Sequence, residues 1–324
     1  MYSNEKILAD VDVIAKSIDD ATHSLKSACS VLRCCYDSNI SKESTKLRGE
    51  ATNHAMVYKE KIFPFANLVV NNIRIFCDNH QFDFDTFKDC IDDFKEEVDK
   101  KHKLVMYTTE LHKKILKEFK QEEDKSKKIY NISELEVKKL EKEVEYLRSS
   151  AKISTWMNVM AIVPIVNLFV FPTIIEKSKM GVIATIKEEQ LEREKATKFT
   201  IGLIRDESIK NFTTSLEKIT AFFYNLSLYL SSLADEKSIR LYYNTSKATM
   251  EKISLSCLNF ISNIPAIESD LDAIDYKYNE NYVNRWYTEQ KVRINGREMS
   301  FLEHGKILFA EDKRILEMLG TDDE

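Results

Sequence analysis

Apolar residues recur every three or four positions along most of this chain, which is the spacing of amphipathic helices rather than of strands. The most regular run, between residues 209 and 233, consists of Ile209, Phe212, Leu216, Ile219, Phe223, Leu226, Leu230 and Leu233. Residues 84–150 show the same steps and, as one helix, would be about 100 Å long at 1.5 Å per residue. We expect these two stretches to pair as antiparallel helices of a bundle.

The flanking parts of the chain also predict helices. Residues 7–35 repeat an apolar pattern every seven positions, which is typical of a bundle helix. A second helix is expected over 62–77, where Pro64 starts or kinks it, and a third from Met250 to Pro265. The polar stretch 41–50 is interpreted as a connection.

The C-terminal 59 residues have a different pattern. Tyr276, Tyr278, Tyr282 and Trp286 form a dense aromatic run. Residues 292–299 surround an Asn-Gly pair and predict a small β-hairpin. A last helix, through Ile307 and Leu319, is expected to end at Gly320.

One segment carries a functional prediction. Residues 153–175 contain no formal charge over 23 positions, and about 20 such residues span a bilayer core. The charged tetrad 176–179 and a second apolar run, 180–186, follow. We therefore predict an apolar hairpin that enters a membrane and whose polar tip holds Glu176, Lys177 and Lys179. The predicted membrane-inserting residues are Ile153, Trp156, Val159, Ile162, Val163, Val166, Leu168, Phe169, Val170, Phe171, Ile174, Ile175, Val182, Ile183 and Ile186.

Helix-breaking residues are concentrated in this hairpin. Pro164, Pro172 and Gly181 are three of only ten Gly and Pro residues in the chain, so we predict that they act as hinges. The two prolines, with Asn158 and Asn167, make the segment a poor permanent transmembrane helix. A buried helical hairpin inside a large core is the alternative interpretation.

Charged residues follow directly after the second apolar run. Glu188, Glu189 and Glu192 are candidates for the lumen-facing wall of a pore, because apolar residues keep there to a narrow stripe. The alternative is a solvated helix above the membrane. Charges at the bilayer midplane cost about 2.5–3.5 kcal/mol each on insertion scales, so crossing should be coupled to assembly.

Composition supports helices and excludes several functions. The 324 residues include six Gly and four Pro, too few for the turns of a β-rich fold. A net charge of −5 offers no basic surface for nucleic acid. The six cysteines form no C-x-x-C pair and are interpreted as reduced, in a protein made in the cytosol without a secretory signal peptide.

The sequence offers little for catalysis. It contains none of the nucleotide-binding, zinc-protease or serine-hydrolase motifs, and no cofactor is predicted. The six histidines are scattered, and we interpret most of them as lying on polar helix faces. The chain is therefore predicted not to be an enzyme.

The uncharged segment, the charged tetrad and the second apolar run resemble the α-helical pore-forming toxins of the ClyA-like kind. Size and the mid-chain position of the apolar segment are most similar to the B component of the α-xenorhabdolysin-type binary cytolysins. The resemblance implies a soluble monomer that inserts its hairpin into target-cell membranes. It also implies assembly with an A component into a hetero-oligomeric, haemolytic ring, after release by lysis or another unconventional route.

The sequence thus predicts an all-α, elongated antiparallel bundle of very long helices with an apolar hairpin at one end. Residues 1–152 and 187–324 would form the tail bundle, and 153–186 the membrane-inserting hairpin. An intracellular membrane-anchored coiled-coil scaffold, or an apolipoprotein-L-like helical protein, is the alternative function. A soluble adaptor that binds no membrane is a third.

Overall fold

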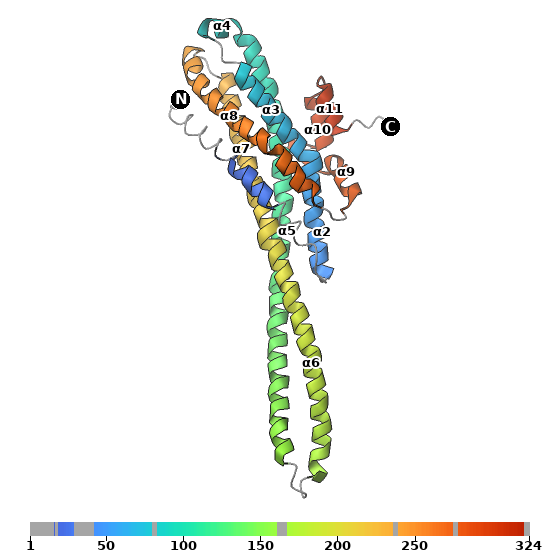
Figure 1. Ribbon diagram of the computed structural model, residues 1–324. Coiled ribbons are helices and arrows are strands. Elements are labelled where there is room, and N and C mark those ends of the chain that lie inside the picture. Colours follow the sequence, from blue (N-terminus) through green and yellow to red (C-terminus); the bar gives the residue numbers. More distant parts are fainter. Residues whose placement is uncertain are drawn as a thin grey trace. The chain divides into compact units, whose positions relative to one another are not determined.

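A computed structural model describes residue 16 and residues 19–28, 42–79, 83–160, 167–235, 239–274 and 278–320. Nearly all of this described chain is helical, as predicted (Figure 1). The elements are α2 (Lys42–Val57), η1 (Tyr58–Ile62), α3 (Phe63–Asn79), α4 (Phe84–Asp89), α5 (Ile91–Met160), α6 (Asn167–Leu203), η2 (Ile204–Ile209), α7 (Lys210–Asp235), α8 (Ile239–Asp272), α9 (Glu280–Glu289), β1 (Lys291–Ile294), β2 (Arg297–Ser300), α10 (Phe301–Leu308) and α11 (Lys313–Leu319).

The chain divides into two compact units. The first comprises residues 1–36, 48–123 and 206–324, and the second residues 37–47 and 124–205. The predicted membrane-inserting segment 153–186 lies in the second unit. Helix α5 has 70 residues and no Gly or Pro, so nothing in its sequence interrupts the backbone hydrogen bonds.

The core of the first unit lies where α5 and α7 pack antiparallel, as predicted. Phe119 of α5 stacks on Phe212 with ring centroids 4.5 Å apart, and His112 lies 4.9 Å from the ring of Phe223. Residues earlier in α5 therefore contact residues later in α7. All described apolar positions of the 209–233 run are buried, which confirms its role as a seam.

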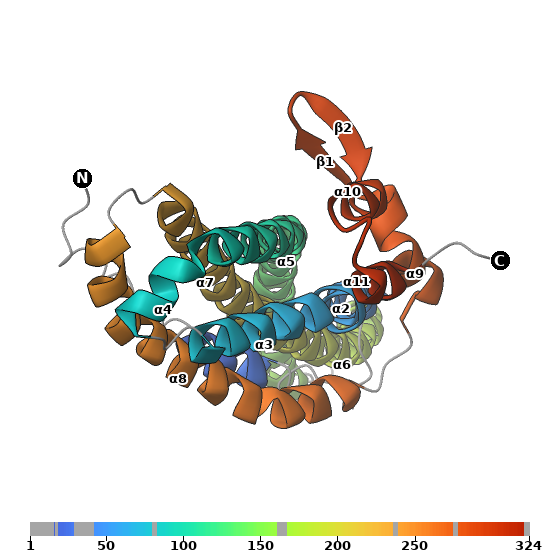
Figure 2. The same cartoon turned by 90° about the horizontal axis from the view of Figure 1, so that it is seen from above.

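Further helices surround this pair. Helix α3 packs along α8, and Figure 2 shows α8 curving around it. Pro64 is the second residue of α3, but it does not start a separate helix, because α2, η1 and α3 follow one another without a break. Of the predicted N-terminal helix, residues 19–28 are described, and Ala21, Leu25 and Ala28 are buried there.

The predicted hairpin is present as β1 and β2, joined by Asn295 and Gly296. Both turn residues have positive φ, 50° and 80°, which is the backbone of a type I′ turn and explains the Asn-Gly pair. Strand register pairs Lys291 with Ser300 and Ile294 with Arg297.

Two predicted boundaries are wrong. Residues 42–50, which were expected in a connection, belong to helix α2, because Ser44 and Leu47 are buried on the same helix as the small side chains of Ala51 and Ala55. The last predicted helix is two helices, α10 and α11. They are separated because Asp312 caps α11, accepting a hydrogen bond from the Ile315 amide at 3.1 Å.

Candidate membrane-inserting hairpin

The second unit is built on two antiparallel helices. Residues 124–150 of α5 lie beside residues 181–203 of α6 (Figure 1). The buried positions on α5 are separated by seven, four, three and four residues, which is the spacing of a coiled-coil seam. They are Ser126, Ser133, Val137, Leu140 and Val144.

The apolar part of this seam is small. Val137, Leu140 and Val144 of α5 form one buried cluster with Leu191 of α6. Towards residue 126, the buried positions of α5 are serines. A seam with so few apolar side chains contributes little hydrophobic stabilisation for its length.

Ion pairs across the helices complete the contact. Their side chains are partly or largely exposed, so each pair contributes little to stability and is weakened by salt. The hydrogen bond from Arg148 lowers the pKa of Glu188. The pairs are Glu134 with Lys198 at 3.5 Å, Glu141 with Lys195 at 3.6 Å, Glu143 with Lys187 at 3.1 Å, and Arg148 with Glu188 at 2.6 Å.

An aromatic contact lies at the opposite end of this seam from the apolar segment. The Arg205 guanidinium lies 4.0 Å from the ring centroid of Tyr130, and Lys198 Nζ lies 5.3 Å from it. A Cβ at Gly202 would stand 3.3 Å from the same ring. The absence of a side chain at Gly202 thus lets Tyr130 approach α6, where two cations lie near its face.

The predicted membrane-inserting residues fall at the other end of the two helices. Ile153, Trp156 and Val159 belong to α5, and six more, from Leu168 to Ile175, belong to α6. Ile162, Val163 and Val166, with the predicted hinge Pro164, lie outside the described residues. Within the described part of the chain, no helix combines the length and apolarity needed to cross a bilayer.

Three predicted membrane-inserting residues have described side chains. Val182, Ile183 and Ile186 of α6 are 60%, 46% and 59% exposed. Three large apolar side chains within two turns of one helix form an exposed apolar surface that the fold itself does not bury.

The predicted polar tip is misplaced. Glu176, Lys177 and Lys179 lie inside α6, and α5 ends at Met160 while α6 begins at Asn167. Glu and Lys are good helix formers, and one Gly costs about 1 kcal/mol, so the helix continues through the tetrad and Gly181. Pro172 also lies within α6. Whether Pro172 and Gly181 act as hinges stays a prediction.

The predicted lumen-facing residues differ from one another. Glu188 is partly buried and paired with Arg148, whereas Glu189 and Glu192 are exposed. Glu192 contacts Lys195 at 3.3 Å. None of these contacts tests a role in a pore.

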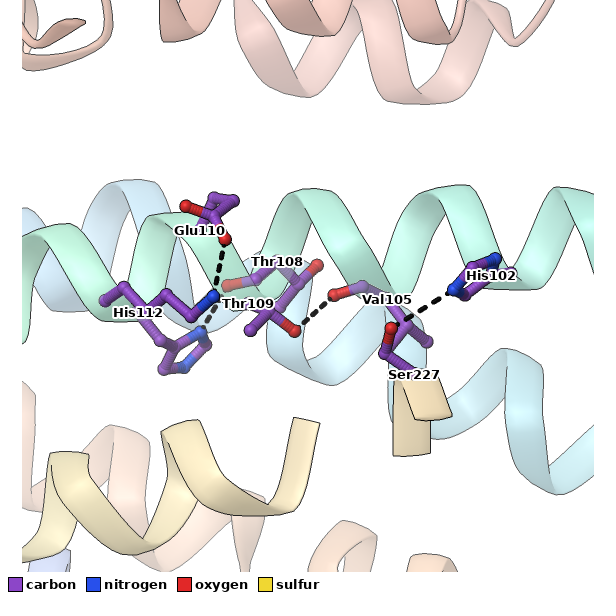
Figure 3. Close-up of polar contacts among 8 residues, drawn as sticks. His102, Val105, Thr108, Thr109, Glu110, His112 and Ser227 are labelled. Atoms are coloured by element: carbon purple, nitrogen blue, oxygen red, sulfur yellow. Dashed lines mark hydrogen bonds and ion pairs between the residues drawn. The ribbon is translucent and has the colours of Figure 1, made fainter. Parts of the chain in front are cut away.

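The histidine interpretation is wrong for the first unit. His54, His112 and His304 are buried, and burial lowers the pKa of His112 to about 4. Figure 3 shows that His112 belongs to a polar stretch of α5, where its Nδ1 donates to the Thr108 carbonyl at 2.7 Å. Thr109 donates to Val105, and His102 Nε2 lies 3.1 Å from Ser227 Oγ.

The sequence interpretation also missed exposed apolar residues on α5. Ile132, Leu135 and Tyr146 are 58%, 67% and 70% exposed. Together with Lys139 and Lys142 they are spaced by three and four positions, so they share one helix face. This spacing was the signal in the sequence, because the face lies away from the buried row through Val137 and Leu140. Among the residues that the structure describes, no group of three or more His, Cys, Asp or Glu could hold a metal ion.

The fold is similar to solved structures of α-pore-forming toxin components. One is soluble AhlC of the tripartite toxin AHL from Aeromonas hydrophila, with a TM-score of 0.55, 9% identity and coverage of 76% of this chain and 98% of that chain. Its soluble triple head mutant matches with a TM-score of 0.57, 8% identity and the same coverage. No family model and no curated protein matches the sequence.

At these identities the comparison shows the fold. The chain shares its helical fold with these two AhlC structures, which are components of an α-pore-forming toxin. Both matched structures belong to a tripartite toxin, whereas the sequence resemblance indicates a binary one.

Proposed function

We propose that this chain is a subunit of a pore-forming cytolysin. It inserts residues 153–186 into a target-cell membrane and assembles with further subunits, a second toxin component among them, into a pore. The observation that carries the proposal is the uncharged 23-residue segment that joins the two helices of a toxin-like fold.

Exposure supports the same assignment. Val182, Ile183 and Ile186 continue the apolar segment along α6, and water covers a large part of each. Their transfer into a bilayer would gain about 25 cal/mol for each Å² of apolar surface removed from water. An apolar surface of this kind favours a membrane or protein partner over a permanently solvated state.

The seam between α5 and α6 supports a change of state. Insertion requires the apolar segment to move relative to the helices that carry it. The seam is held by one small buried apolar cluster and by ion pairs whose side chains are partly or largely exposed. Such contacts are weak enough to be exchanged for contacts with a membrane or another subunit.

The charged tetrad explains why assembly should accompany insertion. Glu176, Lys177 and Lys179 follow the uncharged segment directly, and each charge is costly in hydrocarbon. Neighbouring subunits and a water-filled lumen would solvate these groups. A lone copy would have to bear the whole cost.

The experiment is release of a trapped dye from liposomes and lysis of red cells. The full chain is added with and without lysate of the source cells, which supplies a second component. Phe169→Asp and Ile162→Asp place a carboxylate in the uncharged segment and should abolish release while the helical content stays unchanged. Ile307→Asp changes an exposed apolar residue of α10 and serves as the matched control.

A membrane-anchored scaffold would behave differently. It would partition into vesicles from the start and never release dye. Deletion of residues 153–186 would remove its membrane binding but change no lytic activity, because there would be none. Release that persisted after this deletion would contradict the pore-forming proposal.

A further inference from the structure

A row of exposed residues follows α5 on the side away from the seam. It consists of Ile132, Leu135, Lys139, Lys142 and Tyr146, spaced by three, four, three and four positions. Residues with this spacing lie on one helix face. This row, called the α5 outer row, is apolar at both ends and basic in the middle.

A second row lies on α6. Its residues are spaced by three and four positions, and all are exposed. This row, called the α6 side row, is apolar at both ends and acidic in the middle. It consists of Val182, Thr185, Glu189, Glu192, Ala196 and Phe199.

The contacts of the seam place the two rows at the same level. Glu134 of α5 pairs with Lys198 of α6, so Phe199 lies level with the end of the α5 outer row that holds Ile132 and Leu135. Glu141 pairs with Lys195, and Arg148 with Glu188. The two lysines of one row therefore lie level with the two glutamates of the other.

Within one hairpin these rows lie on different sides of two paired helices. Lys139 contacts its own helix weakly: its Nζ lies 4.0 Å from Glu143, and the lysine side chain is exposed. Glu192, which is exposed, pairs with the half-buried Lys195 one turn further along α6, at 3.3 Å. Exposed pairs of this kind contribute little and do not prevent a stronger contact with another chain.

We propose that the α5 outer row of one copy packs on the α6 side row of a neighbouring copy. Apolar side chains meet at both ends of this interface, and Lys139 and Lys142 meet Glu189 and Glu192 between them. A second copy is the occupant that the pattern favours, because this chain supplies a complementary row at the matching level. A layer of lipid headgroups could pair with the two lysines, but it would offer no apolar surface to the apolar residues at the two ends of the row.

This interface is heterologous, since two different surfaces meet. Each copy then binds one neighbour through its α5 outer row and another through its α6 side row. The contact can repeat from copy to copy until a ring closes. The inference rests on the proposed function in one respect, because it assigns the interface through which the proposed pore subunits assemble.

Charge reversal tests the proposal. The variant K139E/K142E makes both rows acidic, and E189K/E192K makes both rows basic. Each variant alone should lose self-association on vesicles of zwitterionic lipid, measured as the ladder of chemically cross-linked oligomers. Because like charges at an interface are strongly unfavourable, the oligomer fraction should fall at least about tenfold.

Restoring opposite charges on the two contacting rows should restore assembly. In an equimolar mixture of the two variants, each reversed row meets an opposite row on the other chain. The quadruple variant K139E/K142E/E189K/E192K carries both reversals and should assemble by itself. The control K117E/K210E reverses two exposed lysines of the first unit and should assemble as the unchanged protein does.

The outcomes separate this inference from the proposed function. If both charge-reversed variants assemble and release dye as the unchanged protein does, the proposed interface is wrong. The pore-forming proposal would not be affected by this result. Loss of assembly without recovery in the mixture or in the quadruple variant would also overturn it. If the unchanged protein releases no dye, the pore-forming proposal fails, and cross-linking of the same variants in detergent micelles still tests the interface.

Discussion

The indole of Trp286 donates a hydrogen bond to Glu118 Oε2 at 3.1 Å, which joins α9 to the long helix α5. Trp286 is fully buried and stacks on Phe301, with ring planes 10° apart and centroids 5.6 Å apart. Tyr282 donates to the same carboxylate oxygen at 3.4 Å. Within the first unit, Tyr282 and Trp286 of the aromatic run therefore anchor α9 on the long helix α5.

Trp286→Phe should destabilise the protein by about 1–3 kcal/mol. It keeps a ring against Phe301 but removes the donor to a largely buried carboxylate, whose pKa burial already raises. Urea unfolding at pH 7.5 measures the loss. The control Tyr282→Phe removes the longer and more exposed bond and should cost less. Equal stability of Trp286→Phe and the unchanged protein would show that the bond contributes nothing.

His112 should make stability depend on pH. Its folded pKa, about 4, is lower than that of an unfolded histidine, 6.5, so the folded state binds the proton less readily. The contribution of His112 to the free energy of unfolding is then fully present above pH 6.5. It is lost as the pH falls towards 4, by up to about 3 kcal/mol for this one group. Urea unfolding of His112→Phe between pH 7.5 and 5 should show a shallower loss than the unchanged protein. Parallel curves would contradict this account.

Gly305→Ala and Gly181→Ala form a matched pair. A Cβ at Gly305 would lie 2.6 Å from Leu319 Cδ1 and 3.0 Å from the Tyr107 hydroxyl, whereas one at Gly181 would meet nothing within 4 Å. Overpacking at Gly305 should cost about 1–3 kcal/mol. The same change at Gly181 should stabilise α6 by up to about 1 kcal/mol.

The Gly181 variant also tests the hinge. If Gly181 is a hinge of the inserting segment, Gly181→Ala should release dye more slowly than the unchanged protein although it is at least as stable. Thermal unfolding and dye release on the same samples separate the two effects. Unchanged release would remove Gly181 from the predicted hinges.

An apolar seam should hold the hairpin closed. Glu188 and Lys195 flank Leu191 at helical spacing, on the side of α6 that faces the cluster of Val137, Leu140 and Val144. Glu188→Leu/Lys195→Leu would extend that cluster and raise the urea midpoint, because each buried leucine adds about 1.5–3 kcal/mol. Dye release should slow at the same time. Faster release by this more stable variant would show that the seam does not oppose insertion.

The helical architecture was predictable because its signals are local. The run from Ile209 to Leu230 shows a complete seam in the sequence, and its described members are buried in α7. The Asn295-Gly296 turn was predictable for a similar reason, since two positive φ angles favour this pair. Helix α2 was missed because its buried alanines give no hydrophobic signal.

The candidate site was only partly predictable. The uncharged segment is evident in the sequence, but the position of the chain reversal depends on how α5 and α6 pair. The sequence placed it at the charged tetrad, which the structure shows to be helical. The row of Ile132, Leu135 and Tyr146 has helical spacing in the sequence, and the structure shows that these three side chains are exposed.

The burial of His112 could not be predicted from its own neighbourhood. The residue lies among Glu110, Lys113 and Lys114, which indicates a polar face. Its burial follows from the packing of α7 and Tyr58 around it, with Tyr58 and Phe223 at 5.7 and 4.9 Å between ring centroids. Contacts between distant parts of the chain decide such positions.

The central claim is tested most directly by dye release from liposomes by the full chain, with its Phe169→Asp variant alongside. The account predicts that the unchanged protein, alone or with lysate of its source cells, releases small trapped dyes, and that Phe169→Asp binds or stays soluble without releasing them. Membrane binding by both proteins without release of dye under any of these conditions would contradict the account, as would full release by Phe169→Asp.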